Sequence, residues 1–284
     1  MTTLAQALPR RRSLGLGWIR NYVLTVYAGL ALVYLFLPIA VVVLFSFNNP
    51  AGRFNYTWQG FTLTNWTHPL NYPGLSGALK VSIEIAILSS LVATALGTLI
   101  ALALVRYRFK GSGLTNLLIF MPMTTPEVVM GASLLALFVG RGVVLGFLTI
   151  FIAHVMFNIS YVVVTVKARL VGFDRHLEEA AMDLGANEWT TFQKVTLPLI
   201  APGIMAAGLL AFALSVDDFV ITYFNSGSTT TFPLFVWGAA RVALPPQINV
   251  IGTAIFVVAV GGMLVNIVFQ NTRAARARRP ASTA

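Results

Sequence analysis

Six long apolar stretches dominate this sequence, and they decide what the chain can fold into. They cover residues 22–47, 78–105, 114–139, 143–166, 199–223 and 250–269. Each is long enough for a membrane-spanning helix, which needs about 20 mostly apolar residues. Only 10% of the chain is charged, whereas a soluble domain carries about 25%. The stretches lack strand alternation, so we expect an all-α polytopic membrane protein with six transmembrane helices rather than a β-barrel.

The positive charges indicate which ends of the spans face the cytoplasm. The formal net charge is +10, and all but four of the 19 basic residues lie before the first span, between the second and third, between the fourth and fifth, or after the sixth. The exceptions are Arg53, Lys80, Arg141 and Arg241. Because basic residues collect in cytoplasmic loops, both termini are predicted to be cytoplasmic. The same placement favours contact with the lipid bilayer over contact with nucleic acid.

The spans divide the chain into consecutive segments. We expect a cytoplasmic tail at 1–21, a first transmembrane helix at 22–47, an extracytoplasmic loop at 48–77, a five-helix core at 78–270 and a basic cytoplasmic tail at 271–284. The first apolar run is far longer than the core of a signal peptide, which has about 7–15 residues, so we expect an uncleaved span. The chain has no cysteine, which excludes disulfides and thiolate metal sites.

The cytoplasmic segment at 172–198 has a helical pattern. Asp174 can cap a first helix, and Gly185 fits the left-handed position that ends one. Asn187 can cap a second short helix, and Pro198 predicts that this helix breaks or bends before the fifth span. Such a hairpin can pack on the protein's own spans or dock another protein, and the pattern alone favours neither.

The same segment carries a spaced motif. The letters EAA at 179–181 are followed after three residues by Gly185, and after nine more by VTLP at 195–198. This resembles the EAA signature of ABC importer permeases, with valine in place of isoleucine. The resemblance runs from the first span to the sixth and implies the type I ABC importer permease fold. In that family the EAA loop docks on an ATPase, which implies coupling roles for Glu179, Ala180, Ala181, Leu184, Gly185 and Pro198.

ATP chemistry is expected on another polypeptide. The sequence holds no GxxxxGK[ST] loop, whose backbone cradles nucleotide phosphates. The resemblance implies a second permease subunit, two ATPase subunits and an extracytoplasmic substrate-binding protein as partners. It places ATP and Mg²⁺ on the ATPase, no cofactor on this chain, and the whole assembly in the cytoplasmic membrane of a prokaryote.

Four carboxylates lie inside the apolar stretches, where charge is costly and usually functional. Glu84 follows Lys80 by four residues, so an internal pair satisfies it. Glu127 follows two prolines, which predict a broken helix lining a cavity, and we favour a role in meeting a cation. Asp217 and Asp218 are adjacent, so one can face a path while the other holds a neighbouring helix. The sequence does not choose between them.

The intramembrane charges favour a cationic cargo, because no unpaired basic residue lies deep in a span. Aromatic rings beside carboxylates suit ammonium groups through cation–π contacts, and Trp66, Tyr223 and Phe224 are placed for such contacts. The segments at 106–113, 126–138 and 214–227 resemble the spermidine/putrescine branch of these permeases. In that branch the positions of Trp66, of Glu127 and of an acid in the fifth span are associated with the polyamine path, with aspartate mostly standing where this chain has glutamate.

Three alternatives are weighed against this interpretation. A permease for iron, thiamine or an aminophosphonate would carry the same EAA loop, so this alternative stays open. A proton-coupled secondary transporter would not need that loop. An enzyme is not expected, because His68, His154 and His176 are scattered and no HExxH or serine-nucleophile motif occurs. His154 lies in an apolar span four residues before Asn158, so we expect it to make a hydrogen-bonded contact between helices.

Overall fold

The described chain is built from helices, as the sequence predicts. The structure, a computed structural model, describes residues 16–107 and 109–277, and within them the only extended pairing is two isolated bridges. Parts of both predicted tails, residues 1–15 and 278–284, lie outside the described residues. The chain forms two compact units: a terminal unit, whose described residues are 16–69 and 244–277, and a central unit within residues 70–243.

The terminal unit contains two long helices that pack together, α1 (Leu16–Ser46) and α12 (Pro246–Ala277). Of the run Tyr22–Ser46 only Ser46, at its end, is buried inside the described chain, so lipid or a partner subunit must cover the apolar part. The described apolar part of α12, Pro246–Gly262, is shorter than a span. The sixth transmembrane helix at 250–269 therefore remains a prediction.

The segment after α1 is ordered by buried amide side chains. Asn48 Nδ2 donates to Asn55 Oδ1 at 2.6 Å and to the Thr57 carbonyl at 2.8 Å, while its Oδ1 accepts the Gln59 N–H at 2.8 Å. Isolated bridges pair Asn48 with Phe61 and Phe54 with Leu244. The short helix α2 (Thr64–Thr67) follows and contacts α12. These bonds hold a loop that has few regular backbone partners of its own.

The core of the central unit is formed by three long helices that pack on one another, α3 (Leu75–Arg106), α6 (Phe147–Val171) and α9 (Leu197–Asp217). Small residues allow their backbones to approach closely, as is usual between membrane helices. A Cβ atom at Gly97 would lie 2.6 Å from Val162 Cγ1, so no larger residue fits there without a shift. The buried residues of this core are Ala93, Ala101, Val162, Val163, Val166, Leu170, Ile200, Ala207 and Ala211.

The predicted third span is broken, as its prolines indicate. Helix α4 (Ser112–Thr124) and helix α5 (Glu127–Gly140) meet at an angle of 107°. Thr125 is extended, with ψ of 132°, because the ring of Pro126 disfavours a helical residue before it. In the described residues, four helices are long and apolar enough to span a membrane, and five if α4 and α5 form one broken span.

The fifth predicted span differs from the structure at both ends. The short helix α8 (Glu188–Thr191) continues through a π-helical turn, Phe192–Thr196, directly into α9, so the helix does not break at Pro198. Pro198 lies in the first turn of α9, and the π turn before it relieves the clash that proline causes in a regular helix. At the other end α9 stops at Asp217, and α10 (Val220–Asn225) is a separate helix.

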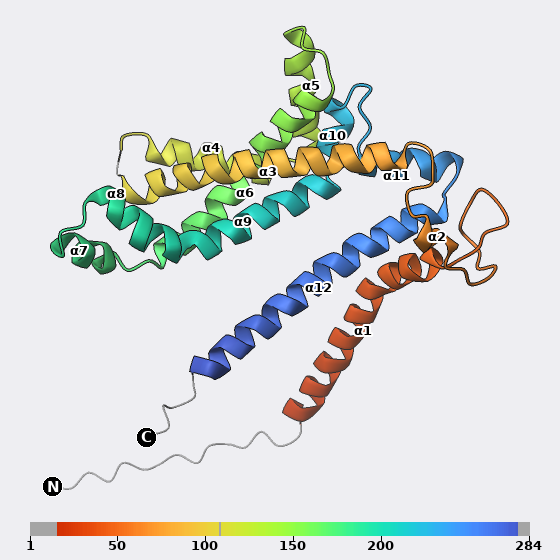
Figure 1. Cartoon of the computed structure of the whole chain (residues 1–284), viewed down its shortest axis with the longest axis horizontal. Coiled ribbons are helices and arrows are strands. Elements are labelled where there is room, and N and C mark those ends of the chain that lie inside the picture. Colours follow the sequence, from red (N-terminus) through yellow and green to blue (C-terminus); the bar gives the residue numbers. More distant parts are fainter. Residues whose placement is uncertain (1–15, 108, 278–284) are drawn as a thin grey trace. The chain divides into compact units, whose positions relative to one another are not determined.

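The remaining short helices lie at opposite ends of the central unit. Figure 1 shows α7 (His176–Asp183) and α8 at one end, and α10 and α11 (Phe232–Val242) at the other. The long helices therefore separate the predicted coupling segment from the acids at the end of α9.

Candidate functional site

The two aspartates at the end of α9 have different surroundings. Asp218 is 9% exposed, and its Oδ2 atom accepts hydrogen bonds from the Thr222 backbone N–H at 2.8 Å and the Thr222 hydroxyl at 2.7 Å. Its Oδ1 atom accepts the Ile221 N–H at 3.4 Å. Because the first N–H groups of a helix have no partner within the helix, this carboxylate caps α10.

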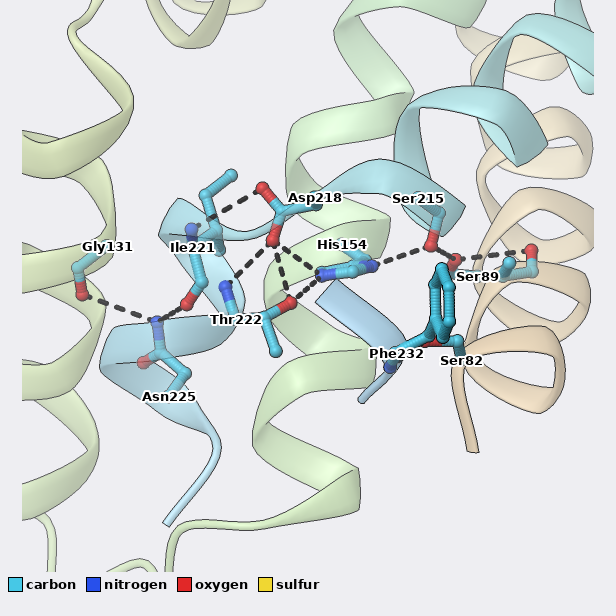
Figure 2. Close-up of polar contacts among 11 residues, drawn as sticks. Ser82, Ser89, Gly131, His154, Ser215, Asp218, Ile221, Thr222, Asn225 and Phe232 are labelled. Atoms are coloured by element: carbon cyan, nitrogen blue, oxygen red, sulfur yellow. Dashed lines mark hydrogen bonds and ion pairs between the residues drawn. The ribbon is translucent and has the colours of Figure 1, made fainter. Parts of the chain in front are cut away.

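His154 of α6 links Asp218 to two other helices (Figure 2). Its Nε2 atom lies 3.1 Å from Asp218 Oδ2, and its Nδ1 atom lies 2.6 Å from the Ser215 hydroxyl. That hydroxyl is 3.1 Å from the hydroxyl of Ser89. A carboxylate only accepts hydrogen bonds, so Nε2 carries the proton shared with Asp218. The expected hydrogen-bonded helix contact of His154 is confirmed, and it joins α3, α6, α9 and the start of α10.

Ser215, His154 and Asp218 have the composition of a hydrolytic triad, but a substrate cannot reach them. Ser215 is 4% exposed and His154 is 2% exposed. A serine nucleophile must reach a substrate carbonyl, whereas this hydroxyl is enclosed between Ser89 and the imidazole. The arrangement therefore connects helices.

Asp217 is exposed and, within the described residues, forms no ion pair. It is the last residue of α9, immediately before the capped break at Asp218. Of the two acids between which the sequence could not choose, Asp218 is buried and Asp217 is exposed.

Glu127 also stands at a helix break. It is the first residue of α5, it is exposed, and it has no ion-pair partner among the residues described. The positive end of the helix dipole stabilises a carboxylate at this position. Glu84, in contrast, lies 3.8 Å from Lys80, so the internal pair predicted for it is confirmed.

Helices α5 and α10 pack against each other, which brings the two breaks into one part of the central unit. A Cβ atom at Gly131 would lie 2.8 Å from the Phe224 ring, so glycine is required at this approach. The Asn225 amide also donates to the Gly131 carbonyl at 3.4 Å. Tyr223 of α10 is 56% exposed, and its ring also packs on the rings of Phe219 and Phe224.

Trp66 belongs to the terminal unit and is held on one side. Its ring stacks on Phe47 with centroids 5.4 Å apart, and its Nε1–H donates to the Ser46 hydroxyl at 3.2 Å. The side chain is half-buried. These contacts fix the orientation of the indole ring above the end of α1.

The predicted coupling segment has the caps that its sequence indicates. Asp174 Oδ1 accepts the His176 N–H at 3.0 Å, at the start of α7. Gly185 has φ of +89°, which favours glycine, and Asn187 Oδ1 accepts the Thr190 N–H at 2.8 Å at the start of α8. The two helices are therefore short and joined by a sharp turn.

The coupling segment presents an apolar and acidic surface. Leu184 is 90% exposed, and Glu179 and Ala180 are exposed as well, while Ala181 is half-buried. Glu179 Oε2 lies 3.0 Å from His176 Nδ1, and this hydrogen bond raises the pKa of His176. The charges of Asp174 and Glu179 raise this pKa further.

Glu178, the residue before the EAA motif, makes a contact between helices that the sequence did not predict. Its Oε1 atom accepts hydrogen bonds from the Arg106 guanidinium, at the last turn of α3, and from the Thr196 hydroxyl, at the end of the π turn. The Glu178 side chain is 15% exposed. One carboxylate thus ties α7 to both α3 and the start of α9.

Comparison with known proteins gives a consistent result. Residues 93–279 match the family described as binding-protein-dependent transport system inner membrane component. The chain is 40% identical over 225 residues to the spermidine/putrescine transport system permease protein PotC of Escherichia coli strain K12, covering 79% of this chain and 84% of that protein. It is 39% identical over 234 residues to the putrescine transport system permease protein PotI of the same strain, covering 80% and 83%.

Solved structures share the fold at lower identity. A bacterial ABC transporter that imports the acidic polysaccharide alginate matches with a TM-score of 0.61 and 18% identity, over 94% of this chain and 99% of that one. A bacterial alginate transporter in complex with its pentasaccharide-bound periplasmic protein gives 0.60 and 16%, over 92% and 96%. At sequence identities this low, the similarity shows only that the fold is shared.

Proposed function

We propose a cargo, a topology and a working cycle for this chain, which belongs to the family of binding-protein-dependent transport system inner membrane components and is the permease subunit of an ABC importer. Its topology has six transmembrane helices with both termini in the cytoplasm. The distribution of basic residues supports this, since the end of the central unit that carries α7 and α8 is also the basic end.

The proposed cargo is a polyamine. The observation that carries this proposal is the pair of exposed carboxylates at helix breaks, Glu127 and Asp217, neither of which has an ion-pair partner in the described chain. An unpaired acid in a span marks a cation path by default. The exposed ring of Tyr223 offers a face to an ammonium group. The transport systems of PotC and PotI, which carry spermidine/putrescine and putrescine, support the same cargo class.

The working cycle is alternating access in an assembly with a second permease subunit, two ATPase subunits and an extracytoplasmic binding protein. The binding protein delivers the cargo, and ATP with Mg²⁺ is bound and hydrolysed on the ATPase subunits. This chain binds no cofactor in the proposal. Its own residues do two things: exposed carboxylates hold the ammonium groups briefly, and the α7–α8 segment receives the movement of the ATPase.

The cargo is tested by binding-protein-stimulated ATPase activity of the reconstituted complex. Spermidine, putrescine, thiamine and ferric iron are supplied in turn with the cognate binding protein. We expect stimulation by spermidine or putrescine alone. Stimulation by thiamine or iron instead would overturn the polyamine proposal and leave the importer assignment in place.

Glu127→Gln is expected to lower ATP-driven polyamine uptake about tenfold, because a hydrogen-bonded contact to a charged group is replaced by a neutral one. Assembly should not change, since this side chain forms no ion pair with the described chain. Uptake into proteoliposomes measures the effect. Glu84→Gln is the matched control, an exposed acid in a span that pairs with Lys80. Equal uptake by both variants would remove Glu127 from the path.

Glu179→Lys is expected to weaken attachment of the ATPase at least several-fold. The Glu179 side chain is exposed, and its ion pair in the described chain is with His176 of the same helix, so a reversed charge is presented directly to the partner subunit. Co-purification of the ATPase subunit with the permease complex measures the loss. An intact complex with wild-type stoichiometry would contradict the docking role of Glu179.

A further inference from the structure

The start of α9 is less regular than the rest of this helix. A π turn precedes it, Pro198 lies in its first turn, and Pro202 lies inside the helix one turn further along. Pro202 has no N–H to donate to the Pro198 carbonyl, so a regular backbone hydrogen bond is missing here. In the proposed cycle, movement of α7 and α8 would enter α9 along the chain through these turns. The position of this segment therefore depends on contacts from neighbouring helices.

Arg169, in the last turn of α6, makes such a contact. Its Nη2 atom donates a hydrogen bond to the Leu199 carbonyl at 3.3 Å, at a position between the two prolines of α9. A carbonyl oxygen has two lone pairs, so it can accept from the guanidinium as well as from its own helix. The Arg169 side chain is exposed and forms no ion pair within the described residues. Its charge is thus directed at the backbone of α9 and not at an acid.

The hydrocarbon part of the Arg169 side chain lies directly on the backbone of Gly203. A Cβ atom at Gly203 would lie 2.8 Å from Arg169 Cγ and 2.9 Å from Arg169 Cβ. Both of these atoms are close to the backbone of α6, so they cannot swing away as the far end of a flexible side chain can. Glycine is therefore needed for this approach of α6 to α9, as small residues are where membrane helices pack closely.

The contact adds α6 to the helices that the coupling segment reaches. Glu178 of α7 bonds to Arg106, in the last turn of α3, and to Thr196, at the end of the π turn. These bonds connect α7 to α3 and to the residue just before α9, and neither of them reaches α6. Arg169 joins α6 to the turns of α9 that follow directly after Thr196.

We propose that Arg169 is a positioning residue for the coupling of ATP hydrolysis to transport. Its side chain lies on Gly203, bonds to the Leu199 carbonyl and holds the proline-containing start of α9 to α6, so that α6 and α9 move together when α7 and α8 are pushed. Without this contact, the start of α9 bends at its prolines and the movement does not reach the rest of the helix. The inference rests on the proposed docking of the α7–α8 segment and extends it to a residue outside that segment.

The competing explanation is that Arg169 is one of the basic residues that orient the spans, as arginines and lysines in cytoplasmic loops do. In that case only its charge matters, and Gly203 has no part in its function. The two explanations differ in what Gly203→Ala does, since this change leaves every charge in place.

Spermidine uptake and binding-protein-stimulated ATP hydrolysis are measured on the same proteoliposomes, which contain the complete importer. Gly203→Ala and Arg169→Ala are each expected to lower uptake per ATP hydrolysed about threefold, the size expected for the loss of one hydrogen-bonded contact. The double variant should also lose about threefold and not about ninefold, because both changes remove the same contact.

Two control variants should leave the ratio unchanged. Gly113→Ala adds the same methyl group in α4, where a Cβ atom meets nothing within 4 Å. Lys110→Ala removes another exposed basic residue, from the segment between the second and third predicted spans. Co-purification of the ATPase subunit with each variant shows that the complex is assembled, so that a lower ratio reports uncoupling.

The possible outcomes separate the explanations. An unchanged ratio in Gly203→Ala would overturn the proposal, as would a loss of about ninefold in the double variant. Equal losses in Arg169→Ala and Lys110→Ala would also overturn it, since they would show that only the cytoplasmic charge matters. Failure of the proposed function is read from other samples: the wild-type importer takes up no spermidine, or Glu179→Lys leaves the ATPase attached.

Discussion

Replacing Glu178 with glutamine is expected to reduce ATP-driven uptake about tenfold while the ATPase stays attached, because the loss of a partly buried, charge-assisted contact is a large effect. The carboxylate of Glu178 accepts from Arg106 and from Thr196, and so joins α7 to the end of α3 and to the start of α9. In the proposed cycle, a push on α7 would pass to the long helices through this contact. Without it, α7 can tilt while the spans stay where they are.

Stimulated ATPase activity and uptake are measured on the same complex, so that uncoupling is distinguished from loss of assembly. Glu188→Gln serves as the control, since it removes an exposed acid in the neighbouring helix α8. Exchanging the partners, with Arg106→Glu and Glu178→Arg together, should restore part of the uptake. Wild-type uptake in Glu178→Gln, with normal assembly, would show that the movement reaches α3 and α9 by another route.

Replacing His154 with phenylalanine is expected to lower the thermal unfolding midpoint by roughly 10 °C. The change keeps a ring of similar shape but removes the donor to Asp218 and the acceptor for Ser215. Leaving the buried Asp218 carboxylate and the Ser215 hydroxyl each short of a hydrogen-bond partner costs about 3–5 kcal/mol together, and each kcal/mol shifts the midpoint by about 2–4 °C in a chain of this size.

Thermal unfolding of the purified complex in detergent measures this loss. Ser90→Ala is the control, because the Ser90 hydroxyl is also part-buried but bonds only to the carbonyl of Ile87 in its own helix. A shift of less than about 2 °C in His154→Phe, similar to that of the control, would mean that the network around Asp218 contributes little to joining the helices.

Local signals in the sequence were enough to predict most of the helices, the helix caps and the protein family. The apolar runs, the prolines at 122 and 126 and the left-handed position of Gly185 each act within a few residues of their own location. The predicted break before Glu127 is confirmed, and so is the EAA-based membership in the permease family. Of the break or bend expected at Pro198, the break is wrong, because a π turn accommodates that proline inside a continuous helix.

Contacts between residues distant in the sequence could not be predicted. Glu178 meets Arg106 across 72 positions and His154 meets Asp218 across 64, and neither pairing leaves a local pattern. Which of Asp217 and Asp218 is buried also depends on contacts between distant residues. The carboxylate of Asp218 turns inward because it caps α10 after the break.

The most direct test of the central claim is spermidine accumulation in proteoliposomes that contain the complete importer, with its binding protein outside and ATP inside. We expect accumulation only when both ATP and the binding protein are present, and loss of most of it in Glu127→Gln. Accumulation driven by a proton gradient without ATP, or no spermidine uptake while another cargo is imported, would contradict the role of this chain in an ATP-driven polyamine importer.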